Sequence, residues 1–206
     1  MPEGERIFSS PLAYLLYNNM PTLNLDILVV PTYNTLTLGV IDASTYPTNP
    51  PVVTSPTIEI NVPGFDTAIL AFDVNNFNIF TSSDLGITAT GVNQPLPDGV
   101  YHLKYSIAPA YENFVEKSII RVDRLQERFD EAFMKLDMME CDRAIKTQSK
   151  VDLNTIYFFI QGAIAAANNC AIVEANKLYN QASTMLTNFS KNNCGCSGNN
   201  YAINFY

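Results

Sequence analysis

The chain has 206 residues, of which 47% are hydrophobic and 16% are charged, and its formal net charge is −8. This composition excludes global disorder, and the acidic balance excludes a broad surface that binds nucleic acid by neutralising phosphates. The longest apolar stretch, residues 157–167, is interrupted by Gln161 and Gly162 and is shorter than the roughly 20 residues of a membrane-spanning helix, so no membrane partner is expected.

The distribution of proline divides the chain into two halves. All twelve prolines lie between Pro2 and Pro109. Residues 1–110 carry two basic and nine acidic side chains, whereas residues 111–206 carry ten basic and eleven acidic ones. Because proline interrupts helices, the first half is expected to form strands and the second half helices.

Apolar residues of the first half recur at every second position. The runs cover residues 23–29, 36–40, 58–62 and 101–107, with turn-forming segments between them. This alternation is typical of strands that bury one face, and the β-branched residues of 117–122 favour a last strand. We therefore predict an antiparallel β-sandwich or small barrel over residues 23–122, preceded by an N-terminal arm over residues 1–22.

The second half has the period of helices. From Leu125 the residues expected on one buried helical face are Leu125, Phe129, Ala132, Phe133, Leu136 and Met139. A second helix is expected to begin at Asp152 as its N-cap and to run to Asn168, and a third begins near Cys170. The sequence thus predicts an α+β fold, with a three-helix region over residues 123–192 and a C-terminal arm over residues 193–206.

Two features of the second half predict contacts between subunits. Apolar residues of the third helix are spaced by alternating steps of three and four, which favours packing along a neighbouring helix, and the small residues near Gly162 also suit a tight hairpin between the second and third helices. Residues 201–206 hold four bulky apolar side chains, which either cover their own domain or add to a neighbouring subunit. The candidate interface residues are Ile172, Ala175, Tyr179, Ala182, Leu186, Phe189, Tyr201, Ile203, Phe205 and Tyr206.

The chain has few residues suited to catalysis. Its one histidine, His102, lies in an alternating strand and faces away from Tyr101 and Leu103, which favours a structural role on the sheet surface. A second histidine for a metal site is missing. No catalytic residue and no enzymatic activity are therefore expected.

Metal and cofactor sites are not predicted either. Cys194 and Cys196 are one residue apart, unlike the two-residue gap of zinc ligands, and Cys141 and Cys170 are expected to be small core residues. Residues 73–78 resemble the start of a calcium loop, but Phe77 occupies a ligand position, so a polar turn is expected.

Several short sequences between residues 95 and 196 resemble those of structural proteins of crAss-like tailed bacteriophages. They are residues 97–105, Glu116-Lys117, residues 121–123, Phe129-Asp130, Leu136-Asp137, Ile156-Tyr157, Gly162-Ala163, Leu178-Tyr179 and residues 193–196. The resemblance implies a virion protein of the neck or tail, assembled in the cytoplasm of the host bacterium. Such a protein forms a ring in the head-to-tail connector or tail barrel, with copies of itself and other neck or tail proteins as partners and DNA only as passing, non-specific cargo.

Two other readings of the sequence stay open. A receptor- or carbohydrate-binding β-sandwich with a helical oligomerisation region predicts an exposed aromatic cluster that includes Tyr33, Tyr46 and Phe65. A small enzyme that uses carboxylates alone requires two acids that converge in a cleft of the first half.

Overall fold

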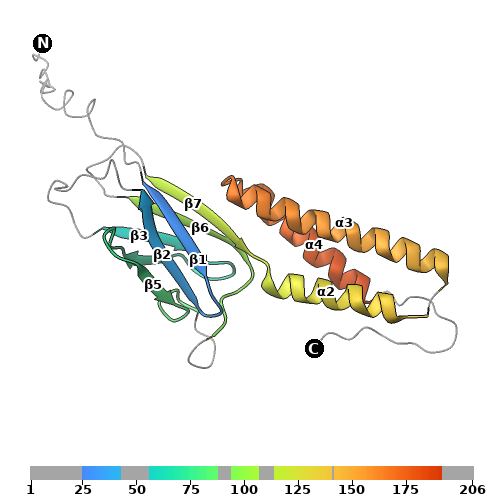
Figure 1. Cartoon of the computed structure of the whole chain (residues 1–206). Helices are drawn as coiled ribbons and strands as arrows, with labels where there is room; N and C mark the ends of the chain where they lie inside the picture. Colours follow the sequence, from blue (N-terminus) through green and yellow to red (C-terminus); the bar gives the residue numbers. More distant parts are fainter. Residues whose placement is uncertain (1–24, 43–55, 88–93, 107–113, 141, 192–206) are drawn as a thin grey trace, which may run out of the picture.

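The computed structural model describes residues 25–42, 56–87, 94–106, 114–140 and 142–191 (Figure 1). Two antiparallel sheets in the first half are followed by three helices in the second, which confirms the predicted α+β fold. The described strands form two separate sheets rather than a closed barrel, so of the two predicted β architectures the sandwich is the correct one.

The first sheet contains β1 (Asp26–Pro31), β2 (Thr35–Asp42) and β5 (Asn78–Thr81), in the order β1-β2-β5. The second contains β3 (Thr57–Asn61), β4 (Ala68–Ala71), β6 (Gly99–Ser106) and β7 (Val115–Arg121), in the order β4-β3-β6-β7. Every strand pair is antiparallel. Strands β4 and β5 are four residues long and were not predicted, because so short a segment shows too little alternation to be recognised.

The core of the sandwich is built by the alternating residues that the sequence pattern places on one face of each strand. The fully buried members of this cluster include Ile27, Leu36, Leu38, Ile58, Ile60, Leu103 and Tyr105. The ring of Phe72 meets that of Tyr105 edge to face, with centroids 4.9 Å apart. Truncating one such aliphatic side chain to Ala would cost about 2–5 kcal/mol of unfolding free energy.

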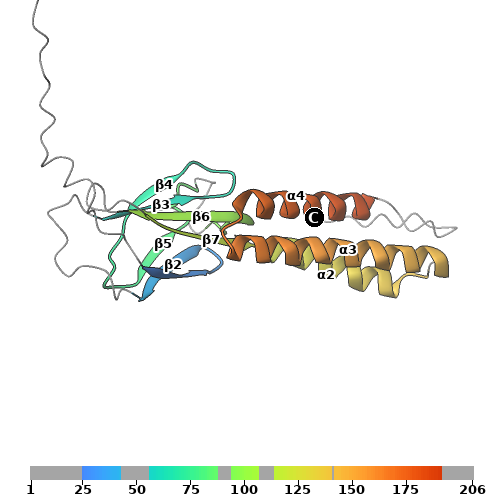
Figure 2. The same cartoon turned by 90° about the horizontal axis from the view of Figure 1, so that it is seen from above.

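The helices are α2 (Asp123–Met138), α3 (Arg143–Asn168) and α4 (Ile172–Lys191), and they extend from one end of the sandwich as a rod (Figures 1 and 2). Leu125, Phe129, Ala132 and Leu136 of α2 are buried, as expected. Phe133, which was expected on the same buried face, is 42% exposed, so this part of the prediction is wrong. None of the described helices combines the length and the apolar character needed to cross a membrane.

Helix α3 begins earlier than the sequence suggested. Asp142 is its N-cap, and the Asp142 side chain accepts a hydrogen bond of 2.8 Å from the Ala144 N–H. Asp152, which was expected to cap the helix, lies inside it and accepts a hydrogen bond from Gln148 one turn earlier. The prediction failed because two Asp residues ten positions apart both offer a suitable capping side chain.

Helices α3 and α4 pack against each other as a hairpin. A Cβ atom at Gly162 would lie 3.2 Å from Leu178 Cδ1, so the glycine allows close approach of the two helices. Cys170 lies in the turn between the two helices, where its backbone is left-handed with φ +54°, and its side chain is exposed. The expectation that Cys170 is a small core residue is therefore wrong, and Cys141 lies outside the described residues.

Candidate functional site

The end of the helical hairpin packs on the second sheet. Val100 of β6 forms a buried cluster with Ala167 and Ala175, which lie near the end of α3 and the start of α4. Ser118 of β7 donates a hydrogen bond from its buried hydroxyl to the carbonyl of Ala167. Small residues at this place let the helix backbones approach the sheet, so the rod is attached at α3 and α4 as well as through α2.

Arg121 joins the first sheet to the first helix. Its buried guanidinium donates hydrogen bonds from Nη1 to the carbonyls of Thr32 (2.7 Å) and Tyr33 (3.1 Å), both in the β1–β2 turn. Its Nε donates to the carboxylate of Asp123, the first residue of α2, over 2.8 Å. One side chain therefore connects both sheets and the rod.

Asp98 holds the start of α2 from the segment that precedes β6. Its Oδ2 accepts a hydrogen bond of 3.0 Å from the Leu125 N–H, whereas its buried Oδ1 has no hydrogen-bond partner in the described part of the chain. Burial raises the pKa of Asp98 above the usual carboxyl value, although the hydrogen bond from Leu125 opposes this. Nearby, the buried Tyr101 hydroxyl donates to the carbonyl of Pro97 over 2.8 Å, and burial raises the pKa of Tyr101. These contacts hold the start of α2 on the sandwich, and we call this place, where sandwich and rod meet, the junction.

The outer face of the first sheet is apolar. We call sheet patch the five side chains Leu28, Val30, Ile41, Phe77 and Ile79, which are each between 42% and 72% exposed. Antiparallel sheets that have one face in the core usually present polar residues on the other face. Exposed apolar faces of this kind are often sites of protein interaction.

Strand register brings the members of the sheet patch together. Leu28 pairs with Gly39 of β2, and the Phe77 ring lies over Gly39, where a Cβ atom would be 2.5 Å from Phe77 Cε1. Thr37 pairs with Val30 on one side and with Ile79 on the other. The patch thus crosses all three strands of the sheet.

A second exposed apolar surface lies on the rod. We call helix patch the side chains Phe133 of α2 and Val151, Tyr157 and Phe158 of α3, which are between 42% and 73% exposed. The ring of buried Phe129 has its centroid 6.4 Å from that of Phe133 and 5.9 Å from that of Tyr157, and the Tyr157 and Phe158 centroids are 6.5 Å apart. The rings therefore form one continuous group across two helices. The sequence pattern missed this surface because Phe133 was assigned to the core.

The predicted interface seam of α4 is used within the chain. Ala175, Ala182 and Leu186 are fully buried, Ala175 against the second sheet and the other two against α2 and α3. The half-buried members of the seam, Ile172, Tyr179 and Phe189, pack against the same clusters. A second copy could reach the buried members only if the helices separated. Tyr201, Ile203, Phe205 and Tyr206 lie outside the described residues.

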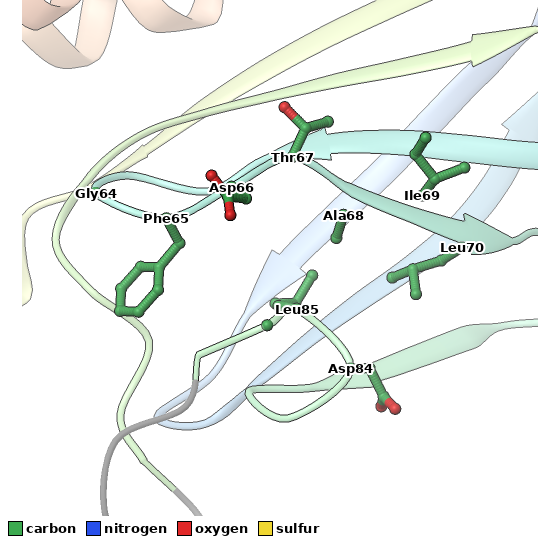
Figure 3. Close-up of a pocket in the computed structure, with 10 residues that line it drawn as sticks. Gly64, Phe65, Asp66, Thr67, Ala68, Ile69, Leu70, Asp84 and Leu85 are labelled. Atoms are coloured by element: carbon green, nitrogen blue, oxygen red, sulfur yellow. The ribbon is translucent and has the colours of Figure 1, made fainter.

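An open hollow of about 540 Å³ lies between the β3–β4 turn and the segment after β5 (Figure 3). Its lining residues are Gly64, Phe65, Asp66, Thr67, Ala68, Ile69, Leu70, Asp84, Leu85 and Gly86. The two carboxylates, Asp66 and Asp84, are well apart, and Asp84 Oδ2 accepts hydrogen bonds from the N–H (2.8 Å) and hydroxyl (2.7 Å) of Thr81. These bonds lower the pKa of Asp84. The hollow therefore brings together no pair of acids for acid–base chemistry.

The other residues considered for catalysis or metal binding are His102, the 73–78 turn and the cysteines. His102 lies on β6, between β3 and β7, and its Nε2 is 3.5 Å from Glu116 Oε1. In the 73–78 turn the Asp73 carboxylate accepts hydrogen bonds from the Asn75 N–H and the Asn76 amide, as a polar turn requires. Among the residues that the structure describes, no three His, Cys, Asp or Glu side chains are grouped to hold a metal ion, and Cys194 and Cys196 lie outside that part.

Comparisons of the chain with protein-family models, with curated proteins and with solved structures find no match.

Proposed function

We propose that the chain is a structural subunit of a tailed-bacteriophage virion, without catalytic activity of its own. In this proposal it forms a ring in the head-to-tail connector or tail barrel, in contact with other neck or tail proteins, and the ring encloses a conduit for DNA. The assignment to a phage virion comes from the sequence resemblance. The observation that supports a role in assembly is the sheet patch, an apolar sheet face that is exposed in the single chain and suited to contact with protein.

The rigid attachment of the rod supports a role in assembly. Subunits of a ring repeat the same contact only if the sandwich and the rod of each copy keep a fixed orientation to each other. The buried guanidinium of Arg121 and the packing of Ala167 and Ala175 on Val100 hold sandwich and rod together at separate points. The two exposed patches thus lie on parts of one firmly joined body.

The charge of the first half suits a wall past which DNA moves. Asp66, Asp73 and Asp84 are exposed. Hydrogen bonds, chiefly from Asn76 and from Thr81, lower the pKa of Asp73 and of Asp84, so both carboxylates stay ionised at neutral pH. Like charge opposes adhesion of the phosphate backbone. In an assembled ring we expect these carboxylates to face the lumen.

Negative-stain electron microscopy of the purified protein, alone and mixed with candidate neck and tail proteins, tests the proposal. We expect ring-shaped particles with a central opening. Particles that stay the size of one chain under every condition, including a large excess of partner proteins, would contradict it.

The hollow near Phe65 supports a second candidate, a receptor- or carbohydrate-binding sandwich. Phe65 and Tyr33 are both exposed, and Phe65 lines the hollow together with Asp66 and Asp84. Ligand sites commonly combine aromatic side chains with a few polar groups. The two aromatics belong to different turns, and Tyr46 lies outside the described residues. Binding on a glycan array that is lost in Phe65→Ala and retained in Phe77→Ala would favour this candidate over the ring.

A further inference from the structure

We propose that the sheet patch of one copy of the chain binds the helix patch of a second copy. This inference rests on the proposed function, since it specifies the contact through which successive subunits of a ring associate. It joins the two exposed apolar groups described above, one on each part of the molecule.

The sheet patch has the composition of a buried surface. The run Ile27-Leu28-Val29-Val30 in β1 is apolar on both faces of the strand, although only the side of Ile27 lies in the core of the sandwich. Such continuous apolar runs are typical of strands that are covered on both sides. Near the centre of the sheet patch the surface is flat, because the ring of Phe77 lies directly on Gly39. A flat apolar face suits the side of a helix pair.

The helix patch offers side chains that are suited to such a surface. Phe158, at 73% exposure, and Val151, seven residues earlier on the same face of α3, project from the rod, and Tyr157 and Phe133 extend the group towards α2. Exposed aromatic side chains that enter an apolar partner surface are the residues that dominate the energy of protein interfaces.

Charge favours contact between unlike patches. Residues 25–122, which form the sandwich and include the sheet patch, carry three basic and nine acidic residues, so two sandwiches repel each other. Residues 123–191, which form the rod, carry eight basic and nine acidic residues and have a net charge of −1. A sandwich therefore approaches a rod more readily than it approaches another sandwich, particularly at low salt.

A contact between two different surfaces also has the symmetry that a ring requires. Each copy then keeps one unused patch of each kind, so further copies add in the same way until the assembly closes. A contact of the sheet patch with itself would stop at two copies.

The test uses two single variants, each of which blocks one patch. Ile79→Glu puts a charge on the sheet patch, and Phe158→Glu puts one on the helix patch. Both side chains are largely exposed, so folding should be retained, which circular dichroism and thermal unfolding verify. By mass photometry we expect each variant alone to be monomeric at concentrations where the unaltered chain assembles, with association weakened at least about tenfold.

Mixing the two variants gives the decisive result. The Ile79→Glu copy retains its helix patch and the Phe158→Glu copy retains its sheet patch, so one contact can form between them. We expect dimers in the mixture and none in either variant alone. Absence of dimers in the mixture would overturn the inference, because it would mean that each patch binds its own kind or another surface.

Matched controls show whether the effect belongs to the patches. Ile69, on β4 of the other sheet, is 65% exposed against 63% for Ile79, and Val173 of α4 is exposed like Phe158. We expect Ile69→Glu and Val173→Glu to assemble like the unaltered chain. If the unaltered chain assembles and the two patch variants do so equally well, the inference is wrong while the proposed function stands. If the unaltered chain never assembles, the proposed function fails, and the inference with it.

A photo-crosslink provides a second, independent measurement. Benzoylphenylalanine at position 158, in place of the native phenylalanine, should crosslink to a second copy within residues 26–42 or 77–81. Crosslinks that map only to α2, α3 or α4 of the second copy would overturn the inference.

Discussion

At the scale of single residues, the junction depends on a buried cation with fixed partners. Arg121 is 7% exposed, and its donors point in two directions, towards the β1–β2 turn and towards the start of α2. Lysine has no second branch and cannot make both sets of hydrogen bonds. The position therefore requires arginine for its geometry as well as for its charge.

Replacement of Arg121 by Met should lower the free energy of unfolding by about 1–3 kcal/mol, because the Thr32 carbonyl loses its donor and the Tyr33 carbonyl, which also accepts from the Leu96 N–H, loses one of two. Arg121→Lys should lose a substantial part of the same energy. Urea denaturation followed by circular dichroism measures both changes. A loss smaller than about 0.5 kcal/mol in Arg121→Met would show that the junction does not depend on this residue.

Asp98 gives the junction a dependence on pH. Its pKa in the folded chain is raised above the ordinary value of 3.8, so the folded state holds a proton that the unfolded state has already lost. The contribution of Asp98 to stability therefore falls as the pH rises from about 4 through the pKa of the folded state. Asp98→Asn removes this titration.

The stability of Asp98→Asn relative to the unaltered chain should thus increase as the pH is raised from 4 to 7. Denaturation curves of both proteins at several pH values measure the difference. A relative stability of the variant that decreases over this range would contradict the raised pKa.

At the scale of elements, the start of α3 can be tested with a pair of variants. Asp142 caps the helix by accepting from the Ala144 N–H, whereas Asp152 lies inside the helix. Asp142→Ala should lower the free energy of unfolding by about 1 kcal/mol, and Asp152→Ala should change it by less than about 0.5 kcal/mol. Equal effects, measured by thermal and urea denaturation, would show that the helix starts elsewhere.

The sequence predicted those elements whose periodic pattern is long. Strands such as β6, with Tyr101, Leu103 and Tyr105 all buried, and the buried face of α2 followed directly from their spacing. The four-residue strands β4 and β5 were missed, because pairing with β3 and β2 determines them more than their own composition does.

The candidate interface was less predictable than the fold. A periodic apolar seam looks the same whether it packs within a chain or between chains, and in α4 the residues Ala175, Ala182 and Leu186 pack within the chain. The sheet patch was visible only after strand pairing brought Leu28, Phe77 and Ile79 together. Contact across strands depends on register, which the alternation of a single strand does not specify.

At the scale of the whole molecule, the chain is elongated, with the sandwich at one end and the rod at the other (Figure 2). The sandwich presents the sheet patch, the rod presents the helix patch, and Arg121 and Asp98 help to fix one part on the other. Contacts between copies follow from these surfaces if the protein is a building block of a larger assembly.

The central claim is that copies of the chain associate through these surfaces. Sedimentation velocity of the purified chain over a wide range of concentration, at low and high salt, tests it most directly. We expect the mean mass to rise with concentration to a defined oligomer, and the oligomer to persist or strengthen at high salt, because the contact is apolar and salt screens the repulsion between chains that each carry a net charge of −8. A single species with the mass of one chain at every concentration and salt would contradict it.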